Sequence, residues 1–178
     1  MATSHPTREA LLDASIRLAE SKGLQQVSIN DIVDAAGVAK GTFYVHFADR
    51  AALLVAIHQR FYDGIIDAMA AATGSRPPGA ERLLLGSEAY LDACLAARGV
   101  KAVLVEARSD LALTVEIGRR DRELAELARP NFRALGFAHA EPAARLFIAL
   151  VATAAVVELE HARRDDPVRA TIAEYLRR

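Results

Sequence analysis

The chain has 178 residues, of which 52% are hydrophobic and 25% charged, so it can build a folded core and is not a largely disordered protein. Its 22 Lys and Arg residues nearly balance 23 Asp and Glu residues, and the net charge of −1 excludes a general polyanion binder. The single cysteine, Cys94, excludes a disulfide framework and a zinc site built from thiolates.

Residues 1–8 are polar and lack the apolar core of a signal peptide. The longest run without charge, Gly or Pro is 146–157, which is twelve residues, whereas a helix that spans a bilayer needs about 20 apolar residues. We therefore expect no transmembrane helix and a cytoplasmic protein.

Apolar residues recur with helical spacing along the chain, and no segment alternates clearly with the period of a β-strand. This pattern predicts an all-α protein. Its first helix should cover about residues 7–22 and end at Gly23. Ser28 should begin a short second helix, with Asp31 completing a capping box, and Gly37 should end it.

A third short helix should follow at once, over about residues 39–45, and Asp49 is suited to cap a longer fourth helix. Residues 73–80, with two prolines and two glycines, are the strongest linker signal and should separate an N-terminal from a C-terminal unit. In the second unit Pro130 should kink or interrupt a helix, and Asp166 should cap the last one. The later helices are expected over residues 81–97, 100–108, 110–135, 142–163 and 167–176.

The second and third helices, joined at residues 36–38, form a helix-turn-helix, whose second helix can lie in a DNA major groove. Phe43 and Phe47 should turn inward and hold this helix in place, while its polar residues and Gly41 face the groove. A position at the start of a helix favours phosphate. The candidate DNA-binding residues are Ser28, Lys40, Gly41, Thr42, Tyr44, His46 and Arg50.

The stretch Ala-Gly-Val-Ala-Lys-Gly-Thr-Phe-Tyr-Val-His-Phe at residues 36–47 resembles the turn and recognition helix of the TetR family of bacterial transcriptional regulators. Residues 28–32 and 49–54 are similar to the flanking elements of that family. The resemblance implies a DNA-binding domain over 1–66, with its motif at about 29–48, and a ligand-binding and dimerisation domain over 67–178. It also implies a homodimer that binds a palindromic operator, and it favours a repressor.

Three positions depart from the family pattern. Ala39 stands where a Ser or Thr often caps the recognition helix, Val45 replaces a polar residue, and Arg50 replaces a Lys. Fewer polar groups predict fewer direct base contacts and a larger role for DNA shape. Because residues 1–50 carry five basic and six acidic side chains, affinity must come from the placement of Lys40 and Arg50.

The predicted helix 142–163 is apolar on nearly every side, which requires burial on every side. A unit this small can bury every face of the helix most simply if a second chain packs against one of them. We therefore expect this helix and the last one to form a four-helix interface in a homodimer. The alternative is a central core helix within one subunit. The interface residues predicted are Phe147, Leu150, Val151, Ala154, Val157, Ile172 and Tyr175.

The helices between about residues 50 and 135 could enclose a cavity for a small, mostly hydrophobic effector, with no other cofactor and no metal. Ordinary core packing is the alternative for each lining residue. The candidates are Phe61, Ile65, Ser87, Tyr90, Leu91, Cys94, Glu106, Leu113, Ile117, Asn131 and Phe132.

An enzyme is not expected. Glu158 and His161 have the spacing of a helical metal motif, but no other His has a Glu three residues before it, and the sequence lacks a phosphate-binding loop and a nucleophile elbow. The remaining alternative is a dimeric helical small-molecule-binding protein that does not read DNA. The acidic balance near the N-terminus supports that alternative.

Overall fold

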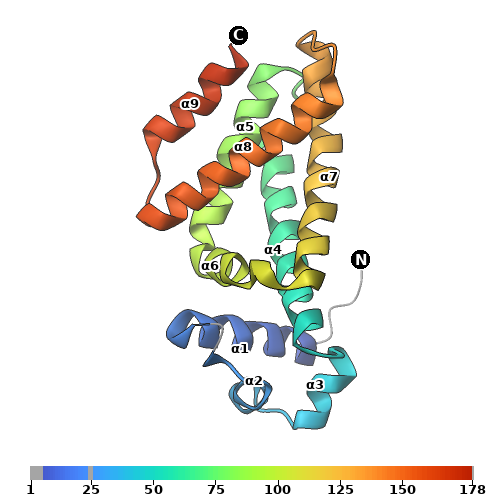
Figure 1. Ribbon diagram of the computed structural model, residues 1–178, viewed down its shortest axis with the longest axis vertical. Coiled ribbons are helices and arrows are strands. Elements are labelled where there is room, and N and C mark those ends of the chain that lie inside the picture. The colour runs from blue at the N-terminus through green and yellow to red at the C-terminus, as the bar shows by residue number, and fades with distance from the viewer. Residues whose placement is uncertain (1–5, 24–25, 178) are drawn as a thin grey trace. The chain divides into compact units, whose positions relative to one another are not determined.

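The computed structural model describes residues 6–23 and 26–177, and this part of the chain folds into α-helices with no β-strand, which confirms the predicted all-α class. Figure 1 shows the helices in chain order. They are α1 (Pro6–Lys22), α2 (Ile29–Ala36), α3 (Lys40–His46), α4 (Arg50–Thr73), α5 (Ala80–Ala96), α6 (Arg98–Glu106), η2 (Ala107–Ser109, a 3-10 turn), α7 (Leu111–Ala134), α8 (Ala140–His161) and α9 (Asp166–Leu176).

The predicted helix ends in the N-terminal part are confirmed by their hydrogen bonds. Ser28 caps α2, and its side chain and that of Asp31 form the expected capping box. Gly37 ends α2 in the left-handed conformation, with φ +68°, and its N–H donates to the carbonyl oxygen of Asp34. At the start of α4 the carboxylate of Asp49 accepts a hydrogen bond of 2.8 Å from the N–H of Ala52.

Two details in the C-terminal part differ from the prediction. Asp165, not Asp166, caps α9, because its carboxylate accepts the N–H of Val168 at 3.1 Å while Asp166 is the first helical residue. Of the two outcomes predicted for Pro130, a kink or an interruption, the interruption is not found, because α7 continues to Ala134. A proline removes one hydrogen bond and crowds the carbonyl oxygen four residues earlier, and the turns on either side can still hold a long helix together.

The chain forms two compact units that are not contiguous in sequence. The first combines Met1–Arg60 with Gly99–Glu116, and the second combines Phe61–Arg98 with Ile117–Arg178. The proline-rich turn between α4 and α5 therefore lies inside the second unit and does not divide the chain, in contrast to its linker-like composition. The functional division at residue 66 remains a prediction.

In the first unit α1 packs on α2 and α2 on α3, around side chains that include Leu11, Leu12, Ile32 and Phe43, each no more than 1% exposed. At the surface of this core, Arg60 of α4 contacts two carboxylates of α1, those of Glu9 and Asp13, at 3.0 and 2.8 Å. These contacts join α4 to α1, the helix on which the short helix α2 packs.

In the second unit α5 packs against α8 and α9, and Figure 1 shows α8 lying across α5. By length and composition alone α8 is apolar enough to cross a membrane. A core helix of a soluble protein passes the same test.

Candidate nucleic-acid interface and ligand cavity

The two faces of α3 differ sharply in exposure. Phe43 and Phe47 are buried, at 0% and 3% exposure, and their rings lie 5.5 Å apart. Arg8 of α1 covers the Phe47 ring, with its guanidinium carbon 5.4 Å from the ring centre. The inward position predicted for these two rings is thus what fixes the orientation of α3 on the first unit.

The opposite face of α3 carries Lys40, Gly41, Tyr44 and Val45, which are all exposed. Tyr44 is 51% and Val45 79% exposed, which is unusual for large hydrophobic side chains. Sequence reasoning treated Val45 only as a lost polar contact. The predicted inward positions of Phe43 and Phe47 already imply that Val45 is exposed, because residues 40, 41, 44 and 45 then share the outer face of the helix.

Of the remaining predicted DNA-binding residues, Thr42 and His46 are half-buried at the edges of that face, and Ser28 is exposed at the start of α2. The Ser28 hydroxyl donates to the Asp31 carboxylate at 2.7 Å and accepts from the Asp31 N–H at 3.2 Å. Its proton is therefore directed at Asp31, so Ser28 would have to break this bond in order to donate to a phosphate.

Asp31 is held ionised by its neighbours. Hydrogen bonds from the backbone and side chain of Ser28, together with Lys22 at 3.2 Å, lower the pKa of Asp31 to about 2. Arg50, the last of the predicted residues, is half-buried and donates to the carbonyl oxygen of Val27. Arg50 thereby ties the start of α4 to the segment before α2.

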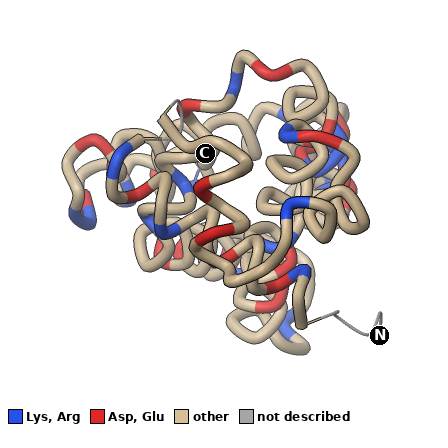
Figure 2. The backbone as a smooth tube through the Cα atoms, turned by 90° about the horizontal axis from the view of Figure 1, so that it is seen from below, with Lys and Arg blue, Asp and Glu red and all other residues tan. Residues whose placement is uncertain are grey.

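Positive charge is not gathered in one block. Figure 2 shows Lys and Arg interspersed with Asp and Glu along the described backbone. On α3 the cationic residue is Lys40, which is exposed and has no ion pair with a described carboxylate. A single, well-placed lysine fits a site that depends on position more than on net charge.

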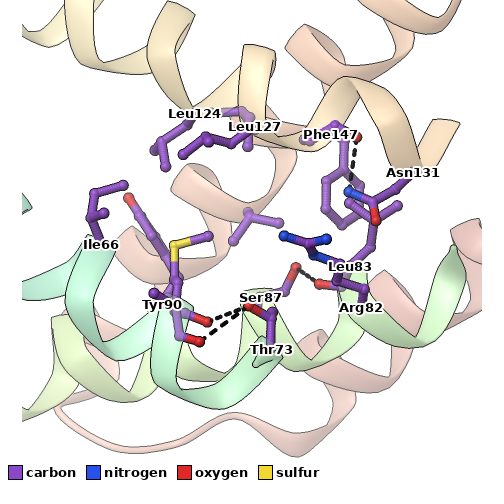
Figure 3. A pocket seen from close by; sticks show the side chains of 16 residues that line it. Ile66, Thr73, Arg82, Leu83, Ser87, Tyr90, Leu124, Leu127, Asn131 and Phe147 are labelled. Carbon is purple, nitrogen blue, oxygen red and sulfur yellow. Dashed lines mark hydrogen bonds between the residues drawn. The ribbon is translucent and has the colours of Figure 1, made fainter. Parts of the chain in front are cut away.

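The second unit contains a cavity of about 200 Å³ between α4, α5, α7 and α8. Figure 3 shows its side chains, most of which are apolar. The lining residues are Ile66, Met69, Ala70, Thr73, Arg82, Leu83, Gly86, Ser87, Tyr90, Leu124, Leu127, Ala128, Asn131, Phe147, Ile148 and Val151.

Three of the predicted ligand-binding residues, Ser87, Tyr90 and Asn131, line this cavity. Others are packed into the core without lining it, namely Phe61, Ile65, Leu91, Cys94 and Phe132, and Ile117 is half-buried on α7. Glu106 and Leu113 belong to the first unit. Their role in ligand binding stays a prediction, since residues that share a helical stripe can point into a core as well as into a cavity.

Two of the polar groups in the cavity bond mainly to the protein itself. The Ser87 hydroxyl donates to the carbonyl oxygen of Leu83 at 2.8 Å, and the Asn131 amide bonds to the backbone of Ala128 and Gly79 at 3.0 and 3.1 Å. Burial raises the pKa of Tyr90, with further contributions from Tyr62 and Cys94, so the Tyr90 hydroxyl stays neutral at physiological pH.

The predicted interface residues divide into two groups. Phe147, Val151, Ala154 and Ile172 are buried within the chain itself, whereas Tyr175 is 60% exposed and Leu150 and Val157 are half-buried. The outer face of α8 continues through Leu146, 73% exposed, Ala149 and Thr153. A stripe of exposed and half-buried residues therefore runs along α8 and includes Leu150 and Val157 of the predicted set.

The spacing of Glu158 and His161 serves a structural role here. Glu158 is buried and accepts hydrogen bonds from Arg169 and from the N–H of Asp165, and His161 lies 3.2 Å from the Asp165 carboxylate. Within the described residues no group of three or more His, Cys, Asp or Glu side chains is arranged to hold a metal ion.

Comparison with known proteins identifies the first unit's motif. Residues 11–57 match the model of bacterial regulatory proteins of the tetR family. An uncharacterized HTH-type transcriptional regulator of Bacillus subtilis, YvdT, is 42% identical over 59 residues, which are 33% of this chain and 30% of that protein. The match thus spans less than a third of the relative's length.

Solved structures are similar over nearly the whole chain. A TetR-family transcriptional regulator from Syntrophomonas wolfei superposes with a TM-score of 0.80 at 18% identity, covering 96% of this chain and 93% of that one. The multidrug binding protein EbrR, complexed with imidazole, superposes with a TM-score of 0.77 at 20% identity, covering 97% and 96%. At these identities the likeness establishes the fold, and the match at residues 11–57 assigns that segment to the tetR family of bacterial regulatory proteins.

Proposed function

We propose that this chain is a transcriptional repressor that binds a palindromic DNA operator as a homodimer and releases it when a small molecule binds. The observation that carries the proposal is the outer face of α3, where Lys40, Gly41, Tyr44 and Val45 are exposed on a helix held by buried Phe43 and Phe47. A helix of this kind can enter the major groove, where Lys40 would neutralise a phosphate and Tyr44 and Val45 would reach base edges or sugars.

Fluorescence anisotropy with the DNA upstream of the protein's own gene tests the DNA-binding part. Tight binding should weaken steeply as salt is raised. Lys40→Ala should weaken binding to all sequences and lower the salt slope by about two, because each protomer of the homodimer loses one phosphate contact. Tyr44→Ala should weaken the specific complex. Arg122→Ala, which removes an exposed arginine from α7 in the second unit, is the control and should bind as the wild type does. Weak, sequence-independent binding by the wild type would contradict the proposal.

The homodimer is supported by the stripe on α8 formed by Leu146, Ala149, Leu150, Thr153 and Val157, together with Tyr175 on α9. These positions repeat at the spacing of one helical face, and Ala149 permits close approach of a second helix. Pairing of α8 and α9 with the same helices of a second copy would cover the stripe and form a four-helix interface. Light scattering in solution should give twice the mass of the 19.2 kDa chain.

The response to a ligand is supported by the cavity in the second unit and by the position of α4. Leu53 and Ile57 of α4 are buried in the first unit, while Ile66, Met69 and Thr73 of the same helix line the cavity. A ligand that binds one conformation of α4 better than another lowers operator affinity by that difference, typically about 1–3 kcal/mol. Operator affinity that is the same with and without a bound compound would exclude that compound as an effector.

The alternative is a dimeric small-molecule-binding protein that does not read DNA. Its support is the acidic balance of residues 1–50 and the engagement of Ser28 and Arg50 in internal hydrogen bonds. The anisotropy experiment separates the two functions. Because the relatives compared are named as regulators or binding proteins, we expect no enzymatic activity, and a regulator of transcription would act in the cytoplasm.

A further inference from the structure

The cavity of the second unit contains one strongly polar side chain whose charge its neighbours do not neutralise. Arg82 of α5 lines the cavity, and Figure 3 shows its guanidinium pointing toward the apolar side chains. Its hydrogen bond is a long one, 3.4 Å, to the carbonyl oxygen of Arg76. Among the described residues Arg82 has no carboxylate partner, and the neighbouring Glu81 pairs instead with Arg76 at 3.5 Å.

This arrangement differs from that of several other arginines in the second unit. Arg169 and Arg120, for example, each contact one or more carboxylates within 3.3 Å. A guanidinium against an apolar wall keeps its donors available for a bound anion, and a carboxylate matches its geometry well. A cationic ligand bound beside this guanidinium would bring two positive charges together, which is unfavourable.

The polar and apolar groups are also separated along the cavity. Arg82 lies near the start of α5, and Asn131 bonds to Gly79 just before that helix. Tyr90 lies eight residues further along α5, which corresponds to about 12 Å along the helix axis. Besides these residues the lining consists mainly of aliphatic and aromatic side chains such as Leu83, Leu127 and Phe147. The hydroxyls of Thr73 and Ser87 also line the cavity, but they donate to the carbonyl oxygens of Met69 and Leu83. A ligand with a charged head and an apolar tail matches this order.

The volume limits the size of that ligand. At about 200 Å³ the cavity is below the range of roughly 300–1,000 Å³ that is usual for drug-sized molecules. We propose that the cavity binds a small anionic amphiphile, a carboxylate with one aliphatic chain of medium length, whose carboxylate pairs with Arg82 and whose chain lies along the apolar wall. The role of this ligand in regulation rests on the ligand response proposed above, whereas its binding to the cavity does not.

Isothermal titration of the full-length protein with octanoate, 1-octanol and octylamine tests the proposal, because these probes share a chain length and differ in the charge of the head. Octanoate should bind at least tenfold more tightly than octanol, and octylamine should bind most weakly. Arg82→Gln should weaken octanoate binding about tenfold or more and leave octanol binding unchanged. Arg82→Lys keeps the charge and should retain part of the preference, whereas Arg122→Gln, at an exposed position outside the cavity lining, should behave as the wild type does.

Equal affinity for the three probes, absence of octanoate binding, or full octanoate affinity in a folded Arg82→Gln protein would overturn the proposal. Measuring operator affinity in the presence of each probe distinguishes a failure of this ligand assignment from a failure of the proposed function. If octanoate binds through Arg82 but leaves operator affinity unchanged, the ligand assignment stands and octanoate is excluded as an effector. If octanol releases the operator and octanoate does not, the response stands and the ligand assignment is wrong.

Discussion

Arg169 of α9 donates two hydrogen bonds to the carboxylate of Glu158 on α8, at 2.6 and 2.8 Å, and both side chains are buried. The same guanidinium reaches Glu88 and Asp92 of α5 at 2.7 and 2.6 Å. One cation therefore joins the three helices α5, α8 and α9. Burial alone would raise the pKa of Glu158, but the hydrogen bonds from Arg169 and Asp165 outweigh it and lower that pKa.

Arg169→Met should lower the free energy of unfolding by about 3–5 kcal/mol, because it leaves the carboxylate of Glu158 buried without its partner. Adding Glu158→Met should recover much of this loss, since the double variant buries no charge. Arg164→Met, which removes an exposed arginine from the same acidic residues, should have little effect. Urea unfolding measures all three, and a double variant no more stable than Arg169→Met would contradict the explanation.

The pKa of about 2 at Asp31 makes the N-terminal unit sensitive to acid. Because the pKa is lower in the folded than in the unfolded chain, the stabilisation is complete above about pH 4 and is lost as the pH falls toward 2. Asp31→Asn should therefore melt at a lower temperature than the wild type at pH 7, and the difference should shrink below pH 4. Asp34→Asn, at an exposed carboxylate of the same helix, is the control. A difference that is independent of pH would refute this assignment.

Val45 should contribute to sequence reading although it is apolar. Its side chain is 79% exposed beside Tyr44, and an apolar group in the major groove can contact a thymine methyl. We expect Val45→Ala to weaken specific operator binding by about 1 kcal/mol with little change in the salt slope, unlike Lys40→Ala. Anisotropy with operator and random DNA would show the difference, and an equal loss on both DNAs would mean that Val45 does not read sequence.

Two helical glycines should respond differently to alanine. Gly64 of α4 has open space where a Cβ would lie, so Gly64→Ala should stabilise the protein by about 0.5–1 kcal/mol. A Cβ at Gly99 of α6 would fall 1.7 Å from Oε1 of Glu20, so Gly99→Ala must displace that side chain and should gain less. Gly99→Ala combined with Glu20→Ala should recover the gain. Equal stabilisation by the two single variants in urea unfolding would show that Glu20 does not occupy this place.

Leu146→Glu should convert the proposed dimer into monomers, because it puts a charge in the middle of an apolar interface. The matched control is Leu111→Glu on α7, since the two leucines are similarly exposed, at 73% and 77%. Sedimentation velocity across a concentration series measures the effect. If Leu146→Glu remains a dimer while Leu111→Glu dissociates, the interface lies elsewhere.

The amino-acid sequence by itself determined the helical class, the helix-turn-helix and most helix ends. These features depend on signals within a few residues, such as the Ser28–Asp31 capping box, the left-handed Gly37 and the inward pair Phe43 and Phe47. The match to the tetR family model covers the same segment, because α3 and the turn before it lie within residues 11–57.

Only the tertiary structure decided which groups lie together. It placed Gly99–Glu116 with the N-terminal helices and left the stripe through Leu146 exposed. It also placed Arg82 at an apolar cavity with no carboxylate partner among the residues that the structure describes. Local periodicity cannot distinguish a side chain that fills a core from one that lines a cavity, since both lie on the same helical face. The difference depends on which distant helix packs opposite, and that is set by the sum of many weak long-range contacts.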